Sequence, residues 1–443
     1  MEGVGDLSFL VTVTGQDRPG IAARIFEALS AVDLLTPVEA ESPVAPFPLT
    51  VLDVGQVRVH GRLLLTIELG VSGVPSGAGQ HAAAAQVGRS LERALITALD
   101  GTRRAPEGQH GTATGEDLTV SVTLSSALEE GSADAPRNQR HLVTVLAPEL
   151  DARALEAVFR TIARQGGNVE RIVRLARYPV VSYELAVAGA DPRELRRTLG
   201  AEAARLSIDV AVQRDGLHRR SKHLIVLDAD STLLRGEVID MLAQKAGRAP
   251  HVAALTEAAM AGTIDFGEAL EKRLACLAGL DAAVLSEVAG SLVLAPGART
   301  LVRTLKRLGY VTAVVSGGFS QVIASVVSDL GIDHMAANTL EVVDGRLTGR
   351  LVGDVVDRPG KAVALERFAR QAHVPLAQTI AVGDGANDMD MLALAGLGIA
   401  FNAKPVVREA ADTALSVPYL DAILFILGIS REEIEAADRE HDH

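Results

Sequence analysis

The sequence predicts an α/β protein in which a parallel sheet with helices on both faces follows two copies of a small α+β unit. In the first half, segments beginning at Phe9 and His141 share one order of strand, polar turn and amphipathic helix. In the second half, continuous apolar runs recur with helical patterns between them, at 223–227, 311–315, 379–382 and 398–401. Such runs are typical of parallel strands that are buried on both faces.

Composition and charge exclude several classes of protein. Apolar residues make up 48% of the 443 residues, which is enough for several folded cores. A formal net charge of −13 and an aromatic content of 3% argue against binding to nucleic acid or to an anionic membrane. Cys276 is the only cysteine, so no intramolecular disulfide forms. We see no signal peptide and no apolar window of about 18 residues, and therefore expect a cytoplasmic protein.

Each copy of the repeat continues in the same way. Further strands are predicted at 61–71 and 180–189, and further helices near 88–99 and 192–204. Small and polar residues fill the stretches 101–117 and 126–140, which are typical of loops or linkers.

The resulting order, strand–helix–strand–strand–helix–strand, resembles the ACT family of amino-acid-sensing modules over residues 5–215. At the turn where this family binds its ligand, the first copy carries Asp17, Arg18, Pro19 and Gly20. The second copy lacks the glycine there. The resemblance implies two ferredoxin-like modules, an amino-acid effector at the first turn, and a homodimer formed by paired sheets. The alternative is that both modules are only scaffolding and dimerisation units.

Polar side chains follow the apolar runs of the second half, and ligands of open parallel sheets bind at the carboxyl ends of the strands. The first run is followed by Asp228, Asp230 and Thr232, and the second by Ser316, Gly317 and Gly318. The third is followed by the sequence GDGAND at 383–388. Asp344-Gly345 predicts a hairpin within 340–353, after which Lys361 begins a helix.

Asp228 and Asp230 pose an electrostatic problem. Like charges about 4 Å apart repel by about 4 kcal/mol at an effective dielectric of about 20. A cation, a shared proton or wide separation in a solvated turn would relieve that repulsion. Taken alone, the pair also fits calcium loops, sugar-nucleotide transferases and capping turns. With Lys361 and helix N-termini in the same crevice, the residues suit a phosphate bound together with a hard cation such as Mg²⁺.

The ordered set of DADST, SGG, a lysine and GDGAND resembles the haloacid dehalogenase superfamily of phosphotransferases over residues 221–425. The resemblance implies a Rossmann-like core in which Asp228 is the nucleophile and forms an aspartyl-phosphate. Asp230 would protonate the leaving oxygen and then accept a proton from water. Asp228 and Asp384 would bind Mg²⁺ through their carboxylates, and Asp230 through its main-chain carbonyl.

The same resemblance assigns the remaining residues of these motifs. Asp388 would hold Lys361 or a water on the metal. The phosphoryl group would be bound and stabilised by Ser316, Gly317 and Lys361.

The interval 236–294 has helical patterns and would form a lid over the site. Its spacing, D-x-D-S-T-x-x-x-x-E followed by A-M-x-G-x-x-x-F-x-x-x-L-x-x-R, resembles the phosphoserine phosphatase family. This implies that Glu237 binds the substrate's ammonium group and that Arg273 binds its carboxylate. Taken singly, either charge would be an ordinary solvated helix residue. The resemblance also assigns substrate contacts to Asn387, Met260 and Phe266.

We therefore expect Mg²⁺-dependent hydrolysis of O-phospho-L-serine to L-serine and phosphate, the last step of serine biosynthesis. Rival hypotheses are a phosphatase of phosphothreonine or protein phosphoserine, a phosphotransferase to an acceptor alcohol, and an amino-acid-sensing regulatory protein. The expected domains are a first module at 1–125, a second at 140–215, a catalytic core at 221–235 and 295–430, and a helical cap at 236–294.

Overall fold

The computed structural model describes residues 4–17, 20–31, 49–59, 61–75, 80–100, 118–125, 140–216, 219, 221–260, 263–264 and 266–441. The chain forms two compact units, which divide between Ala133 and Asp134. The first unit contains one α+β module, and the second contains another such module together with the parallel sheet. Of the two predicted linkers, only Arg140 belongs to the described residues.

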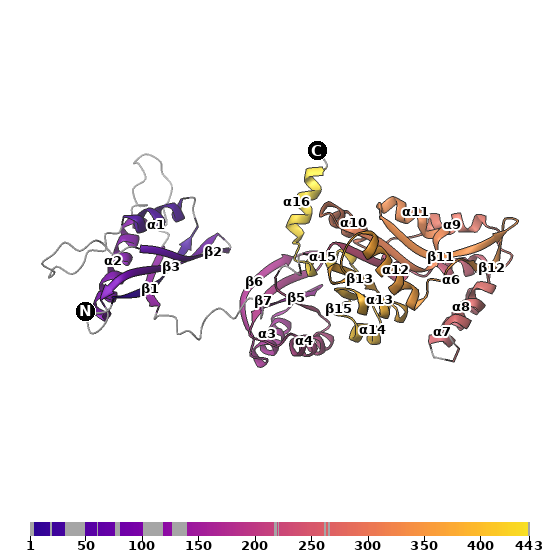
Figure 1. Cartoon of the computed structure of the whole chain (residues 1–443), viewed down its shortest axis with the longest axis horizontal. Coiled ribbons are helices and arrows are strands. Elements are labelled where there is room, and N and C mark those ends of the chain that lie inside the picture. Colours follow the sequence, from indigo (N-terminus) through magenta and orange to yellow (C-terminus); the bar gives the residue numbers. More distant parts are fainter. Residues whose placement is uncertain are drawn as a thin grey trace. The chain divides into compact units, whose positions relative to one another are not determined.

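The first module is an antiparallel sheet with the strand order β2-β3-β1-β4 and two helices packed on one face (Figure 1). Alternation defines that face: Phe9, Val11 and Val13 are buried, whereas Leu10 is 39% exposed. The elements are β1 (Val4–Gln16), α1 (Ile21–Ser30), β2 (Leu49–Val59), β3 (Arg62–Pro75), α2 (Gln80–Asp100) and β4 (Thr119–Ser125). The predicted order ends in a fourth strand without locating it, and β4 supplies that strand between the predicted linkers.

The second module repeats this order. Its sheet runs β6-β7-β5-β8, so each strand occupies the place of its counterpart in the first module, which confirms the predicted repeat. Side chains of Asp151 and Asp191 accept hydrogen bonds from the first turns of its two helices. The elements are β5 (Arg140–Ala147), α3 (Ala152–Arg164), β6 (Asn168–Ala176), β7 (Val181–Ala188), α4 (Pro192–Leu206) and β8 (Asp209–Arg214).

The second module packs directly on the parallel-sheet core. Leu146 and Ala211 of its sheet belong to the same buried apolar cluster as residues 423–426 of the core. Ser416 donates its backbone N–H to the buried carboxylate of Asp209 at 2.6 Å. The sequence does not predict this contact, because an apolar strand face does not reveal which surface covers it.

The core sheet has the order β12-β11-β10-β9-β13-β14-β15, and every neighbouring pair is parallel except β11 and β12. The central strand is fully buried, as its continuous apolar run predicts. The strands are β9 (Leu224–Asp228), β10 (Val311–Phe319), β11 (His334–Val343), β12 (Arg346–Val352), β13 (Thr379–Gly383), β14 (Gly398–Phe401) and β15 (Thr413–Leu415).

Helices and short helical turns connect these strands or follow the last of them (Figure 1). They are η3 (Ala229–Leu233), α10 (Ala298–Arg307), α11 (Ser320–Leu330), α12 (Arg358–Gln371), η4 (Leu376–Gln378), η5 (Ala386–Asp388), α13 (Met389–Leu394), α14 (Pro405–Ala410), η6 (Leu420–Ala422), α15 (Ile423–Ile426) and α16 (Arg431–His441). Within the described residues, none of the helices has the length and apolar character to cross a membrane.

A helical cap is inserted between η3 and α10. Its two linkers run antiparallel, because Leu234 bridges to Leu294 and the backbone N–H of Arg235 donates to the carbonyl of Val293 at 2.8 Å. The cap helices are α6 (Val238–Lys245), α7 (Ala249–Met260), α8 (Phe266–Ala275) and α9 (Ala283–Ser291).

The hairpin of β11 and β12 also holds the cap. It turns at Asp344 and Gly345, both with positive φ, as the sequence predicts. The backbone N–H of Gly279, just beyond α8, donates to the carbonyl of Leu347 at 2.8 Å. The C-terminal end of α8 is therefore fixed to the core sheet and not only to the cap linkers.

Candidate active site

The central strand delivers two carboxylates to the carboxyl edge of the sheet. Asp228 is the last residue of β9, and Asp230 lies in the η3 turn that follows. Ser231 has a φ of 58°, so the chain reverses within this short turn. The hydroxyl of Thr232 donates to Oδ1 of Asp384 at 3.1 Å, which joins the η3 turn to the end of β13.

The neighbouring strand β10 delivers a hydroxyl and a glycine turn. Ser316 is fully buried, and its hydroxyl lies 3.4 Å from Oδ2 of Asp230. The backbone N–H of Gly318 donates to that hydroxyl at 2.8 Å. A Cβ on Gly318 would lie 2.7 Å from Oδ2 of Asp230, so only glycine allows this approach.

A buried lysine links the carboxylates from the other side. Lys361, in the first turn of α12, lies 2.6 Å from Oδ1 of Asp228 and 2.6 Å from Oδ1 of Asp388. All three side chains are almost completely excluded from solvent. The second oxygen of Asp388 accepts the backbone N–H of Gly385 at 2.9 Å. Asp388 is therefore held on both oxygens by the protein itself.

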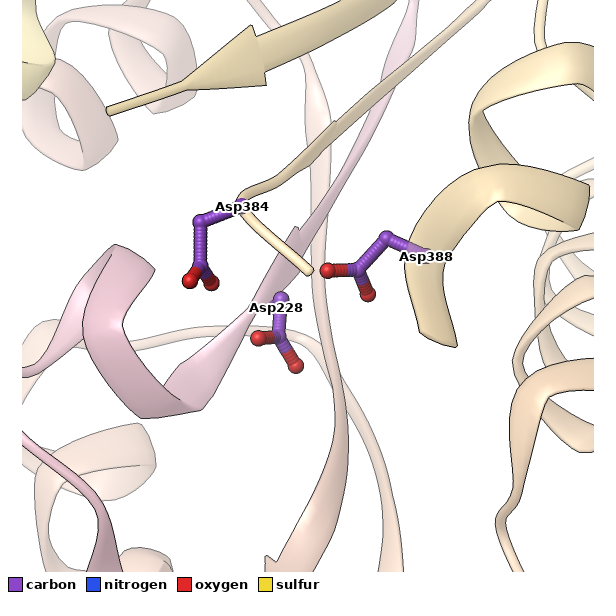
Figure 2. Close-up of side chains that lie close together, drawn as sticks. All are labelled: Asp228, Asp384 and Asp388. Carbon is purple, nitrogen blue, oxygen red and sulfur yellow. The ribbon is translucent and has the colours of Figure 1, made fainter. Parts of the chain in front are cut away.

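The carboxylates of Asp228, Asp384 and Asp388 gather at one point (Figure 2), with one oxygen of each within 4.8 Å of the others. Both oxygens of Asp388 already accept hydrogen bonds. Within the described residues, each of Asp228 and Asp384 keeps one oxygen without a hydrogen-bond donor. An oxygen-rich site with spare carboxylate oxygens fits a hard divalent cation such as Mg²⁺.

The pKa values reflect the crowding of these charges. Burial raises the pKa of Asp228 well above its usual range, and the charge of Asp388 adds to the rise. Burial likewise raises the pKa of Asp384 to about 6. Burial alone lowers the pKa of Lys361, but the carboxylates of Asp228 and Asp388 outweigh it and raise that pKa. A bound cation would relieve the remaining repulsion.

Asp230 has the environment of a proton donor. Burial raises its pKa to about 7, and the carboxylate of Glu237 adds to the rise. Its Oδ1 accepts the backbone N–H of Val238 at 2.9 Å, which fixes its position at the entrance to the cap. A carboxylic acid with a pKa near neutrality both donates and accepts protons efficiently there.

The cap residues predicted from the sequence approach the same place. Glu237 accepts the hydroxyl of Ser231 at 3.1 Å, next to the η3 turn. Arg273 lies on α8, where burial lowers its pKa while the charges of Glu237, Asp240 and Asp230 oppose that change. Arg273 therefore lies within electrostatic reach of Glu237 and Asp230.

Comparison with known proteins shows which family the chain belongs to. A haloacid dehalogenase-like hydrolase model matches residues 225–393, and an ACT domain model matches residues 139–213. The phosphoserine phosphatase of Streptomyces coelicolor is 47% identical over 435 residues, which cover 97% of this chain and 94% of that protein. The chain belongs to the phosphoserine phosphatase family. The phosphoserine phosphatase SerB2 of Mycobacterium tuberculosis is 45% identical over 441 residues, which cover 98% of this chain and 96% of that protein.

Solved structures share the fold of about two thirds of this chain. A probable phosphoserine phosphatase of Vibrio cholerae, in its unliganded form, has a TM-score of 0.54 and 32% identity, and the match covers 69% of this chain and 91% of that one. A haloacid dehalogenase family hydrolase of Salmonella enterica has a TM-score of 0.58 and 26% identity, and the match covers 65% of this chain and 98% of that one. Both matches are longer than the catalytic core expected from the sequence.

Not every predicted site residue of this family member falls in the described part. The side chains of Met260 and Phe266, and both Arg18 and Pro19, lie outside it. Asn387 lies in η5, where its side chain folds over Gly385.

At the predicted effector turn, Asp17 pairs with Arg58 of β2 at 3.0 Å. Gly20 has a φ of 89° and caps the N-terminus of α1. These contacts hold the described ends of the turn against the sheet and the helix.

One residue beside the site carries no signal in the sequence. Asn338 is buried in β11 and hydrogen-bonds to the backbone of the glycine turn after Ser316. A lone asparagine in a strand pattern matches no motif, so nothing in the sequence marks Asn338 as part of the site.

Proposed function

We propose that this chain is an Mg²⁺-dependent phosphoserine phosphatase, which hydrolyses O-phospho-L-serine to L-serine and inorganic phosphate. The observation that carries the proposal is the buried bridge from Lys361 to Asp228 and Asp388, with Asp384 beside it. The proposal assigns the role of nucleophile to Asp228, that of a fixed positive charge to Lys361, and metal binding to the free oxygens of Asp228 and Asp384; their closeness supports these roles. The names of the full-length relatives support the substrate.

The reaction has two displacements at phosphorus. In the first, an oxygen of Asp228 bonds to phosphorus as the bond to the serine oxygen breaks, and Asp230 donates a proton to that oxygen. In the second, water attacks the aspartyl-phosphate, Asp230 takes back a proton, and Asp228 is released with phosphate. Lys361 and Ser316 stabilise the negative charge of the phosphoryl group throughout.

The carboxylates of Asp228 and Asp384 and the carbonyl of Asp230 would hold Mg²⁺, which when bound would supply charge neutralisation for the approach of a carboxylate to an anionic phosphate. Asp388 contributes by holding Lys361, since both of its oxygens are already engaged.

Glu237 and Arg273 determine which ester enters. A guanidinium binds a carboxylate through two parallel hydrogen bonds, and a carboxylate binds an ammonium group. A zwitterionic phospho-amino acid satisfies both residues, whereas a sugar phosphate satisfies neither. Asn387, Met260 and Phe266 complete the substrate contacts implied by the family pattern.

Regulation and assembly belong to the modules. We propose that an amino acid, with L-serine as the first candidate, binds the turn from Asp17 to Gly20 and changes activity, and that the chain is a homodimer. The ion pair between Asp17 and Arg58 holds the first residue of this turn against β2. Calorimetry of the full chain with L-serine, repeated with Asp17→Ala, tests the effector site; equal heats from both proteins would reject it. Analytical ultracentrifugation tests the homodimer.

Phosphate release from phosphoserine, phosphothreonine and a phosphoserine peptide, each with Mg²⁺ and with EDTA, tests the activity. Turnover of phosphoserine that requires Mg²⁺ and is absent in Asp228→Asn is the expected result. A preference for phosphothreonine or for the peptide would reject phosphoserine as the substrate. Transfer of phosphate to labelled serine would indicate a phosphotransferase that uses an alcohol as acceptor. We place the enzyme in the cytoplasm at the last step of serine biosynthesis; cell fractionation and serine auxotrophy of a deletion strain test this.

A further inference from the structure

The parallel ladder between β10 and β11 is interrupted beside the phosphate site. Ser316 pairs with Ala337, but the next pair joins Phe319 to Asn338, so two glycines of β10 stand outside the ladder. Buried backbone groups that lose a ladder partner need another one. The turn that the proposed function assigns to phosphate binding therefore depends on a partner from outside the strand.

Asn338 supplies that partner. Its side chain is only 1% exposed, and its Nδ2 donates to the carbonyl of Gly317 at 2.9 Å. Its Oδ1 accepts the backbone N–H of Val356 at 2.8 Å, and Nδ2 also lies 3.5 Å from the carbonyl of Val356. One primary amide thus bonds to backbone groups on two separate segments.

Both segments lead to groups that hold the phosphoryl moiety. Gly317 follows Ser316 directly, and its carbonyl fixes the orientation of the peptide that precedes Gly318. Val356 lies just before α12, whose N-terminus is capped by Asp357 through the N–H of Gly360 at 2.8 Å. Lys361 lies in the first turn of that helix. The side-chain amide of Asn338 therefore links the segment that carries the Ser316 hydroxyl to the segment that carries the Lys361 ammonium group.

We propose that Asn338 is a positioning residue that sets the separation between the Ser316–Gly318 turn and Lys361. It does not contact the phosphoryl group. It acts by preventing the glycine turn and the start of α12 from moving apart when negative charge is bound between them. The proposal uses the phosphate site of the proposed function, but not the identity of the esterified alcohol.

The chain contains a matched control. Gln321 of α11 also bridges a backbone N–H and C=O with its side-chain amide, both belonging to Leu340. Its Nε2 lies 2.7 Å from the Leu340 carbonyl, and its Oε1 accepts the Leu340 N–H at 3.1 Å. Leu340 lies on β11 only two residues beyond Asn338, but its backbone leads to no phosphate-binding group. Loss of either amide removes a comparable structural bridge.

The test compares Asn338→Leu, Asn338→Asp and Gln321→Leu with the unaltered chain. The leucine variants remove both bonds, whereas Asn338→Asp keeps an acceptor for Val356 and loses the donor to Gly317. Two readouts are made well below the melting temperature of each protein. They are the dissociation constant of inorganic phosphate with Mg²⁺, by calorimetry, and kcat and KM on p-nitrophenyl phosphate.

We expect both leucine variants to melt at lower temperature, but only the Asn338 variants to bind phosphate about tenfold more weakly, with kcat/KM lowered at least as much. If Asn338→Leu does not fold, Asn338→Asp provides the same comparison. Phosphate affinity unchanged in the Asn338 variants, or changed equally in Gln321→Leu, would overturn the proposal. If phosphoserine is not turned over but the aryl phosphate is, the proposed substrate fails while this test is unaffected.

Discussion

The Nζ of Lys361 lies 2.6 Å from Oδ1 of Asp228, and the two side chains are only 1% and 4% exposed. An ammonium and a carboxylate in this setting have lost most of their hydration, so each depends on the other for its charged state. The same lysine holds Asp388 at 2.6 Å. One positive charge therefore holds the carboxylates of Asp228 and Asp388 side by side.

Replacing Lys361 with methionine should leave two buried carboxylates without a counter-charge. We expect the free energy of unfolding to fall by about 3–5 kcal/mol at pH 8 in EDTA. Burial already raises the pKa of Asp228, and loss of the lysine removes a charge that lowers it, so the folded pKa of Asp228 rises further above its unfolded value. The deficit therefore grows as pH rises from the unfolded pKa. Urea unfolding should show a smaller deficit at pH 5 than at pH 8, and an equal deficit at both would contradict this account. Lys272→Met, which breaks an exposed pair with Glu268, is the control.

Asp230→Asn should separate substrates by leaving group. The serine alkoxide needs a proton as it leaves, whereas p-nitrophenolate does not. We expect kcat/KM for phosphoserine to fall by about 10²–10⁴ and that for p-nitrophenyl phosphate to fall much less. Because burial raises the pKa of Asp230 to about 7, kcat/KM for phosphoserine in the unaltered enzyme should fall as pH rises past that value. That alkaline limb should disappear in the variant; its persistence would assign the proton to another group.

Arg273→Ala should weaken recognition of the amino-acid part of the substrate. We expect kcat/KM for phosphoserine to fall by about 10–100-fold, the value of a charge-assisted hydrogen-bonded contact, with little change for p-nitrophenyl phosphate. Lys272→Ala, at the preceding position of α8 and half-exposed, controls for loss of a positive charge on this helix. Equal losses on both substrates would remove the basis for assigning Arg273 to the carboxylate.

Gly349→Ala should disturb Arg273 from a distance. A Cβ at this position of β12 would lie 3.1 Å from the carbonyl of Leu274 and 3.2 Å from Cα of Ala275, at the end of α8. We expect a several-fold rise in KM for phosphoserine, because α8 must shift away from the hairpin. Gly353→Ala is the matched control, since its φ is also +82° but nothing lies within 4 Å of the added Cβ. Both should lose about 1 kcal/mol of stability from the positive φ, and only the first should change KM.

Arg219→Met should loosen the second module from the core. Arg219 lies 2.6 Å from Glu184 of β7, with both side chains 8% exposed, and it donates to the carbonyl of Ile426 at 2.9 Å. Among the described residues, its loss leaves the buried Glu184 with only the longer contact to Arg171 as an ion pair, so we expect about 3 kcal/mol lower unfolding free energy. Arg197→Met, in an exposed pair on α4, should change little. Similar effects of the two substitutions in urea unfolding would show that the buried pair does not hold the interface.

Much of the site could be predicted from local pattern. The apolar run that ends at Asp228 predicts a buried parallel strand, and the strand rule then places Asp228, Ser316 and Asp384 at one edge. The sequence predicts the repeat because strand and helix patterns follow one another in the same order in both copies. It predicts the hairpin because Asp344-Gly345 favours positive φ. In each case the signal lies in the residue types and periodicity of short segments, and needs no knowledge of how those segments pack.

The sequence by itself determined the sheet classes, the repeat and the motif residues, since these depend on short-range periodicity and on residue type. Only the tertiary structure decided that Asn338 bridges Gly317 to Val356, that Gly349 touches α8, and that the core covers the second module's sheet. These contacts join segments far apart in the chain. The residue type of an amide, a glycine or an apolar strand face does not reveal which distant segment it contacts. Close packing selects those partners, so they follow from the whole fold and not from any local stretch.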